Sequence, residues 1–269
     1  MVTSVQLGHV VGDLGPVDRD DRGINDTETF IGTVGGEFGR RRAYIKVLRS
    51  HQLANELLCA TIGREIGLSI PTPYLLEVLP EDLPDSHLLR EPGALLYAFG
   101  SDDASHPSLR RRMERRTSLD YSLISGWRGW ENGATFDQWV ANGDRHGGNI
   151  LMESREVMWL IDHDYAFTGP RWIASRLIPS APIHNQILLC FNAALQADAR
   201  SAALDRIREC MTGLRAVDIG GAMTASRVNT FLAPSDSAAL EQFIQERLKS
   251  VVHQMADVLG MPMLAGVNP

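Results

Sequence analysis

The chain of 269 residues has few cysteines, no long apolar run and no excess of positive charge. Its three cysteines, Cys59, Cys190 and Cys210, lie in largely apolar stretches without metal-ligand spacing, so we expect reduced thiols rather than a disulfide framework. No stretch reaches the roughly 18 apolar residues that a membrane-spanning helix needs, and the N-terminus lacks a basic segment followed by an apolar one. The formal net charge of −7 argues against general binding to nucleic acid. We therefore expect a cytoplasmic protein that binds neither membranes nor nucleic acid directly.

The composition itself is that of a soluble globular protein. A chain of 269 residues with 44% hydrophobic residues predicts one large domain, or two lobes, with a substantial core. One segment departs from the acidic balance: Arg110–Arg112 is followed by Arg115 and Arg116. Such a segment is either a solvated helix face or a docking patch for an acidic partner.

The most informative stretch is residues 142–149, which read N-G-D-R-H-G-G-N. The apolar run 157–161 follows, reads as a buried strand and leads into Asp162. Phosphoryl transfer needs a carboxylate that orients the attacking hydroxyl and oxygen ligands that hold Mg²⁺ against the phosphates. Asp144 fits the first role, and Asn149 and Asp162 fit the second.

The motif resembles a known family. Asn142-x-Asp144-x-His146-x-x-Asn149 is similar to the N-x-D-x-H-x-x-N catalytic loop of HipA-like serine/threonine kinases, and D-R-H-x-x-N also occurs in phosphatidylinositol kinases. The approach to the loop, F-x-x-W-x-x-N over residues 136–142, extends the resemblance to the HipA-like proteins.

The N-terminal part supplies candidates for nucleotide binding. Two β-rich segments, 30–34 and 42–48, flank a glycine-bearing turn and predict a hairpin, in which the backbone N–H groups of Gly35 and Gly36 could approach phosphates. Lys46 lies in an apolar strand, where an unpaired ammonium would be costly, so we expect it to face an anion or a cleft. Kinases pair such a lysine with a helix glutamate. Glu56 lies beside the apolar stripe of the helix predicted over residues 51–66 and is the candidate partner.

The order of these features predicts an α+β fold of the two-lobed protein-kinase-like type. Residues 1–98 would form a small β-rich N-lobe, and residues 99–269 a mainly helical C-lobe. The apolar segment 93–99 is the expected hinge strand, and a single amphipathic helix is predicted over residues 237–259. Asp162-His163-Asp164 stands where many kinases have D-F-G, so a mobile flip is not expected. Either His163 and Asp164 contact the metal ligands from behind, or Asp164 binds a second metal ion. Residues 168–185 are predicted to form an irregular segment where a substrate could dock.

The predicted reaction moves the γ-phosphate of Mg-ATP to a hydroxyl. Asp144 would deprotonate that hydroxyl, and Asn142 would brace the loop. His146 would either orient Asp144 or stabilise the transferring charge. The family resemblance implies a protein serine or threonine as the acceptor, and possible roles as a toxin with a partner antitoxin.

Three alternatives to a protein kinase remain. D-R-H also fits a small-molecule or lipid kinase, and the altered Asp162–Asp164 segment fits a nucleotide-binding module without turnover. Gly143-Asp144-x-His146-Gly147 also resembles the metal loop of binuclear phosphoesterases, although the further metal-ligand loops of those enzymes are absent downstream.

Overall fold

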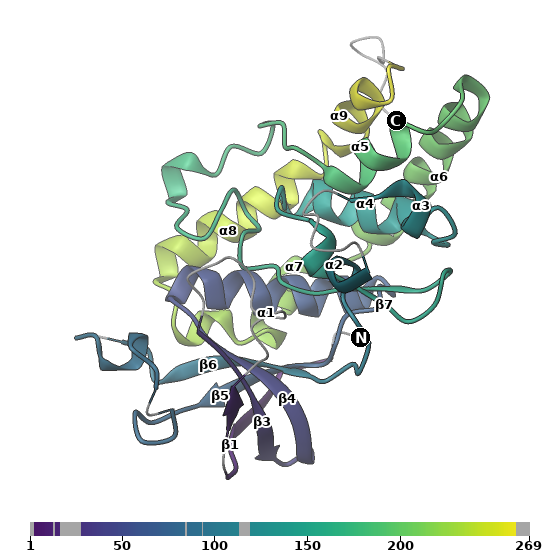
Figure 1. Cartoon of the computed structure of the whole chain (residues 1–269). Helices are drawn as coiled ribbons and strands as arrows, with labels where there is room; N and C mark the ends of the chain where they lie inside the picture. Colours follow the sequence, from purple (N-terminus) through teal and green to yellow (C-terminus); the bar gives the residue numbers. More distant parts are fainter. Residues whose placement is uncertain are drawn as a thin grey trace.

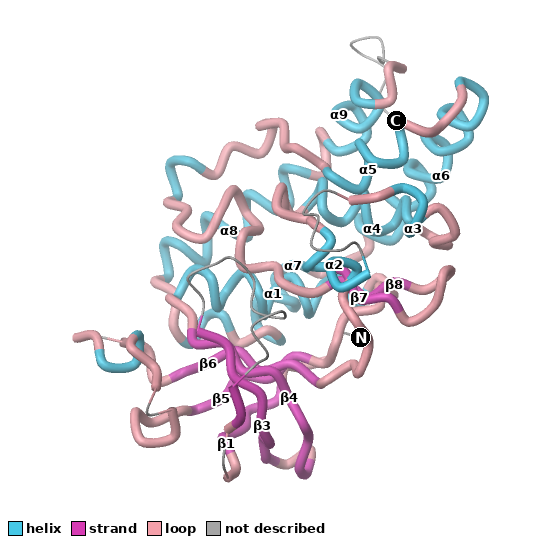
Figure 2. Tube along the Cα trace, viewed as in Figure 1, coloured by secondary structure: helices cyan, strands magenta, loops and turns pink. Residues whose placement is uncertain are grey.

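The computed structural model describes residues 3–12, 14–16, 28–83, 85–92, 94–112 and 119–261. The main sheet lies at one end of the molecule and most helices lie at the other (Figure 1; Figure 2). The chain therefore combines α and β structure, as predicted.

The main sheet closes on itself. Its strands are β1 (Gln6–Val10), β2 (Gly15–Pro16), β3 (Glu28–Gly36), β4 (Gly39–Val47), β5 (Pro73–Glu77) and β6 (Tyr97–Asp102). They run in the order β1-β5-β6-β4-β3-β2, and an additional pairing of β1 with β3 joins five of the strands into a barrel. The predicted hairpin is confirmed, because β3 and β4 are antiparallel and Gly36 pairs with Gly39. A separate cluster of buried apolar side chains fills the barrel, among them Val34, Ile45, Leu76 and Ala98.

Helix α1 (Ser50–Glu65) contacts both the barrel and the helical part. It packs against β5 and β6 on one side and against α7 on the other (Figure 1). Its apolar stripe of Leu53, Leu57, Leu58 and Ile62 is fully buried, as the 3.6-residue spacing predicts. Because its middle turns are buried on all sides, any polar residue there must find a partner inside the protein.

The remaining elements form the helical part and a short hairpin. The helices are α2 (Leu109–Arg112), α3 (Tyr121–Ile124), α4 (Trp130–Trp139), α5 (Gln186–Asn192), α6 (Ala197–Arg215), α7 (Ile219–Ala225), α8 (Pro234–Arg247) and α9 (Val251–Val258). The hairpin consists of β7 (Ile150–Met152) and β8 (Met158–Leu160), and short 3₁₀ turns lie at Leu88–Arg90, Gly147–Asn149, Ala174–Arg176 and Val228–Thr230. Phe136 and Trp139 are fully buried and anchor the approach to the loop 142–149, as predicted.

The single helix predicted over residues 237–259 is wrong: the structure divides it into α8 and α9. The apolar spacing continues through the break, but Ser250 donates hydrogen bonds through Oγ to the carbonyls of Arg247 at 3.0 Å and Pro179 at 3.1 Å. Serine side chains that bond nearby carbonyls compete with helix continuation. The periodic pattern could not reveal this contact, because Pro179 is distant in sequence.

Several other boundaries also shift. The predicted strand 93–99 begins at Tyr97 and continues to Asp102, and α7 was not predicted. In the basic segment noted above, Leu109–Arg112 are helical and Arg115 and Arg116 lie outside the described residues, as do residues 17–27 of the N-terminal region.

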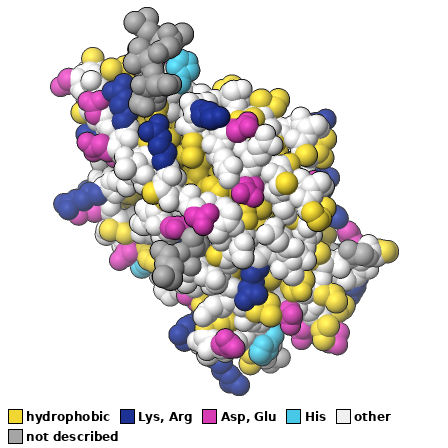
Figure 3. Space-filling view, turned by 180° about the vertical axis from the view of Figure 1, so that it is seen from behind, with side chains coloured by type: hydrophobic (Ala, Val, Ile, Leu, Met, Phe, Trp, Pro, Cys, Tyr) yellow, Lys and Arg dark blue, Asp and Glu magenta, His cyan; other side chains and the backbone are white. Residues whose placement is uncertain are grey.

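The three cysteines are free thiols; Cys59 is buried and the other two are partly buried. Within the described part of the chain, no helix has both the length and the apolar character that a membrane span requires. On the face opposite to the view of Figure 1, acidic and basic side chains are interspersed (Figure 3).

Candidate active site

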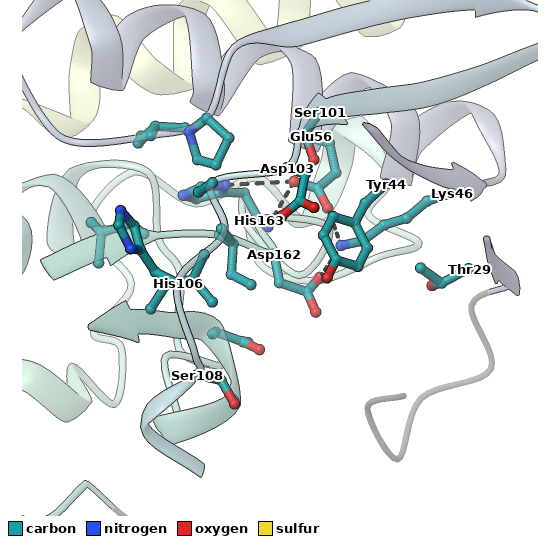
Figure 4. Close-up of a pocket in the computed structure, with 18 of the residues that line it drawn as sticks. Thr29, Tyr44, Lys46, Glu56, Ser101, Asp103, His106, Ser108, Asp162 and His163 are labelled. Carbon is teal, nitrogen blue, oxygen red and sulfur yellow. Dashed lines mark hydrogen bonds and ion pairs between the residues drawn. The ribbon is translucent and has the colours of Figure 1, made fainter. Parts of the chain in front are cut away.

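One cavity is lined by residues from five places in the fold: the barrel, α1, the segment after β6, the loop 142–149 and the end of β8 (Figure 4). Its lining includes most of the polar residues predicted from the sequence: Lys46, Glu56, His146, Asn149 and Asp162. Residues that sequence reasoning had not singled out also line it, including Thr29, Tyr44, Asp103 and His106. The first group contains the candidates for the chemistry of the site.

Lys46 joins two carboxylates at the centre of the cavity. Its Nζ lies 2.6 Å from Oε1 of Glu56 and 2.9 Å from Oδ1 of Asp162. Burial lowers the pKa of Lys46, but the charges of Asp162 and Glu56 outweigh burial and the net pKa is raised. Burial acts to raise the pKa of Asp162, but the charge of Lys46 and the hydrogen bonds from Asp164 and Lys46 together lower it by more, to about 2. Both groups are therefore charged at neutral pH.

Glu56 also holds the segment that follows Asp162. Its Oε2 accepts a hydrogen bond from the backbone N–H of His163 at 2.9 Å, and His163 Nδ1 lies 3.5 Å from the same oxygen. Burial lowers the pKa of His163, so its imidazole is neutral at pH 7. One buried carboxylate thus connects the strand lysine to the backbone beside Asp162.

Two side chains brace the loop 142–149. The backbone N–H of Asp144 donates to Oδ1 of Asn142 at 3.1 Å, which is the bracing contact expected of Asn142. Asn142 Nδ2 in turn donates to Oδ1 of Asp137 at 3.3 Å. The loop is therefore attached to the end of α4, whose aromatic residues lie in the core.

Sequence reasoning missed Arg145, whose contacts hold the loop in place. It is fully buried and forms a two-point ion pair with Asp137, with Nε and Nη2 at 3.0 and 2.9 Å from the carboxylate oxygens. Its Nη1 donates to the carbonyls of Asn149 and Ile161. Arg145 therefore couples the loop to the residue before Asp162. The arginine of D-R-H was the available signal, but the motif alone does not say which way its side chain points.

Asp144 and His146 face each other beside the cavity. His146 Nε2 lies 3.9 Å from Oδ2 of Asp144, and the backbone N–H of Gly148 donates to His146 Nδ1 at 2.9 Å. A neutral ring whose Nδ1 accepts a hydrogen bond carries its proton on Nε2, the atom nearer Asp144. Burial raises the pKa of Asp144, and the charge of Asp162 adds to this effect, while His146 opposes it. A carboxylate of raised pKa is a better proton acceptor than an ordinary aspartate.

Asn149 presents one amide atom to a cation. Its Nδ2 donates to the carbonyl of Asp144 at 2.9 Å, which leaves Oδ1 as the atom that can bind a metal ion. Within the described residues, no group of three or more His, Cys, Asp and Glu side chains could hold a metal ion. One amide and one carboxylate, Asp162, instead fit Mg²⁺, which keeps several waters and takes its remaining oxygens from phosphates.

Asp164 stands where a glycine is common in kinases, and its surroundings fix it. Gln52 Nε2 donates to its Oδ2 at 3.0 Å. Burial and the charge of Asp162 raise the pKa of Asp164 to about 8. Asn55 Nδ2 donates to the carbonyls of Asp164 and Ala166 at 2.7 and 2.9 Å. These bonds tie the segment after Asp162 to α1, in agreement with the prediction that it does not flip.

The irregular segment 168–185 is also anchored. Arg247 is fully buried and its Nη1 donates to the carbonyls of Pro179 and Ala181, each at 2.8 Å. Trp172 Nε1 donates to Oδ1 of Asn55 at 2.9 Å. The segment thus has fixed contacts at both halves, and it has one short 3₁₀ turn at Ala174–Arg176.

The structure does not bring Gly35 and Gly36 to the cavity. Thr29 pairs with Lys46 at the cavity end of the hairpin, and Gly35 lies six residues (35 − 29) further along β3, or about 20 Å. A Cβ on Gly36 would lie 2.7 Å from the carbonyl oxygen of Leu7. These glycines therefore allow β1 to approach β3 and close the barrel. The prediction that they bind ATP is corrected, because a glycine pair beside a turn also fits close strand packing.

Two comparisons with known proteins both point to kinases. A family model described as HipA-like kinase matches residues 44–172, which contain Lys46, Glu56, the loop 142–149 and Asp162. The structure is similar to the crystal structure of a Helicobacter pylori proinflammatory kinase, CtkA, with a TM-score of 0.57 and 12% sequence identity over 94% of this chain and 97% of that chain. At this identity the likeness concerns the fold. No protein of curated function matches the sequence. The resemblance read from the loop 142–149 is confirmed, because the HipA-like kinase model covers the part of the chain that contains this loop.

Proposed function

We propose that this protein transfers the γ-phosphate of Mg-ATP to a serine or threonine hydroxyl of a protein. The observation that carries the proposal is the position of Lys46, within 2.9 Å of both Glu56 and Asp162, in a cavity that Asn149 also lines. The proposal includes a two-lobed arrangement in which residues 1–98, together with the rest of β6, form the small lobe, and the remainder of residues 99–269 forms the helical lobe. The cavity between the barrel and the loop 142–149 supports this arrangement.

In the proposed reaction, Lys46 binds the phosphates of ATP and Glu56 keeps its ammonium in place. Asp162 and Asn149 would hold Mg²⁺, which neutralises charge on the β- and γ-phosphates when it is bound. Glu56 retains its hydrogen bond from the His163 N–H, so the position of the residue next to Asp162 is maintained while Lys46 contacts phosphate. Adenine would contact backbone groups at the end of β6 and directly after it, where residues 101–104 line the cavity.

Asp144 would accept the proton of the attacking hydroxyl. Its raised pKa and its position beside His146 support this role. His146 carries its proton on the atom that faces Asp144, so it can keep the carboxylate oriented toward the acceptor. Asn142 and Arg145 would act through the loop backbone as positioning residues.

The match to the HipA-like kinase model also supports a biological proposal. HipA-like kinases suggest a toxin that acts on a protein in the cytoplasm and is neutralised by a partner antitoxin. An acidic chain with a formal charge of −7 fits a partner protein better than direct binding to nucleic acid.

Labelled ATP tests the proposal. The protein is incubated with a cell lysate and γ-labelled ATP, and the label is separated into protein and small-molecule fractions. We expect label on protein serine or threonine. Label confined to small molecules would favour a small-molecule or lipid kinase, which the D-R-H sequence also fits. ATP binding without transfer would favour a binding module, the reading that the fixed Asp162–Asp164 segment supports.

A further inference from the structure

Arg110 reaches the catalytic loop from the segment that follows β6. It lies in α2 and lines the cavity together with His146, Gly148 and Asn149. Its Cδ is 3.8 Å from the point where a Cβ of Gly148 would stand, and the ring of His146 is 2.7 Å from the same point. Arg110 and His146 therefore both pack over Gly148. Since His146 faces Asp144, Arg110 lies on the side of the cavity where a hydroxyl acceptor would enter.

The acidic side chains of the cavity already have partners. Lys46 holds Glu56 and Asp162. Arg42 Nε lies 3.0 Å from Asp103, and the hydroxyl of Tyr74 donates to Asp102 at 2.7 Å.

Arg110, in contrast, has no ion pair or side-chain hydrogen bond with any residue in the described part of the chain, although its side chain is half-buried at the cavity wall. A guanidinium that has lost part of its hydration without gaining a carboxylate is arranged to receive an anion from outside the protein. The adjacent Arg111 also lines the cavity and adds positive charge there.

We propose that Arg110 determines acceptor specificity by binding an acidic side chain of the protein substrate close to the hydroxyl that is phosphorylated. This inference rests on the proposed protein-kinase function. The phosphates of ATP have Lys46 and the two metal ligands as partners, and the acceptor hydroxyl has Asp144, whereas the side chains that flank this hydroxyl in the substrate have no partner among the residues discussed so far. A guanidinium binds carboxylates through two parallel hydrogen bonds, which fixes direction as well as charge. It also offsets the repulsion that a chain of net charge −7 exerts on an acidic substrate.

The test uses a library of peptides that contain one serine and flanks of defined charge. Wild type should phosphorylate peptides with glutamate flanks with a kcat/KM at least about tenfold above that for lysine flanks, the size expected of one charged hydrogen-bonded contact. Arg110→Gln should remove most of this preference through the KM of the peptide, with the KM of ATP unchanged within about twofold. Arg110→Glu should reverse the preference. Arg215→Gln, on the exposed end of α6, is the matched control and should behave as wild type.

Two results would overturn the inference. The first is a preference that does not depend on residue 110 or is absent from wild type. The second is an effect of Arg110→Gln on the KM of ATP, which would assign the guanidinium to the nucleotide. The failure of the proposed function looks different, because then no peptide or protein would be phosphorylated in an Asp144-dependent manner.

Discussion

Replacement of Lys46 by methionine isolates the charge arrangement on which the site depends. Methionine fills the space of the lysine stem but leaves Glu56, 1% exposed, and Asp162, 21% exposed, without their cation. Removal of one member of a buried ion pair costs about 3–5 kcal/mol, because the remaining charge stays buried. Glu56 keeps the hydrogen bond from His163 and Asp162 has some contact with water, so we expect the lower end, about 3 kcal/mol.

A second substitution separates this effect from a general loss of packing. Glu56→Gln in the Lys46→Met background removes one of the two uncompensated carboxylates. The double variant should therefore be more stable than the sum of the single losses predicts, with a coupling of about 1.5–3 kcal/mol. Urea unfolding followed by tryptophan fluorescence measures each variant. Lys249→Met, at an exposed position, is the matched control and should change stability by less than about 0.5 kcal/mol.

The pH dependence gives an independent reading of the same pair. The pKa of Asp162 is lowered from 3.8 to about 2. An acid whose pKa is lower in the folded state than in the unfolded state stabilises the fold at pH values above its unfolded-state pKa, here near 4. This stabilisation disappears as the pH falls toward 2. The difference corresponds to about 2 kcal/mol. Lys46→Met should not show this loss below pH 4. The reasoning would be refuted if the stability losses of Lys46→Met and Glu56→Gln were additive in the double variant. It would also be refuted if Lys46→Met lost stability below pH 4 to the same extent as wild type.

Two further predictions concern neighbouring residues. Asn149→Ala removes the amide oxygen proposed to bind Mg²⁺, so the Mg²⁺ concentration for half-maximal phosphate transfer should rise by at least about tenfold, and an unchanged requirement would exclude Asn149 as a ligand. The pKa of Asp164 is raised from 3.8 to about 8, so between these pH values the folded protein keeps a proton that the unfolded chain releases. The protonated carboxyl therefore contributes to the stability of the fold fully below about pH 4, and this contribution is lost as the pH rises through about 8. Asp164→Asn should therefore gain stability relative to wild type between pH 5 and 8 in urea unfolding, and a constant difference over that range would contradict the raised pKa.

The sequence predicted the polar centre of the site because its signals are local. The spacing of Asp144, His146 and Asn149 lies within one loop, and Lys46 was conspicuous as a charge in an apolar strand. Glu56 could be selected because helical periodicity placed it beside the buried stripe of α1. Each of these inferences needs only a few neighbouring residues.

The errors and omissions arise from contacts between distant segments. The parallel pairing of β1 with β5 and its pairing with β3 close the barrel, and they explain why Gly35 and Gly36 are glycines. The bond from Arg145 to the carbonyl of Ile161, and the bonds from Asn55 to the segment after Asp162, join elements whose sequences give no sign of meeting. Such partners become visible only when the chain is folded.

The most direct test of the central claim compares wild type with Asp144→Asn at saturating Mg-ATP, with saturation verified by calorimetry. The measured quantity is the rate at which labelled γ-phosphate appears on protein serine or threonine. The account predicts that Asp144→Asn binds Mg-ATP as wild type does, within about twofold, and loses roughly 10²–10⁴-fold in transfer, the usual contribution of a general base. Equal transfer by both proteins would show that Asp144 is not the base and would contradict the proposed site.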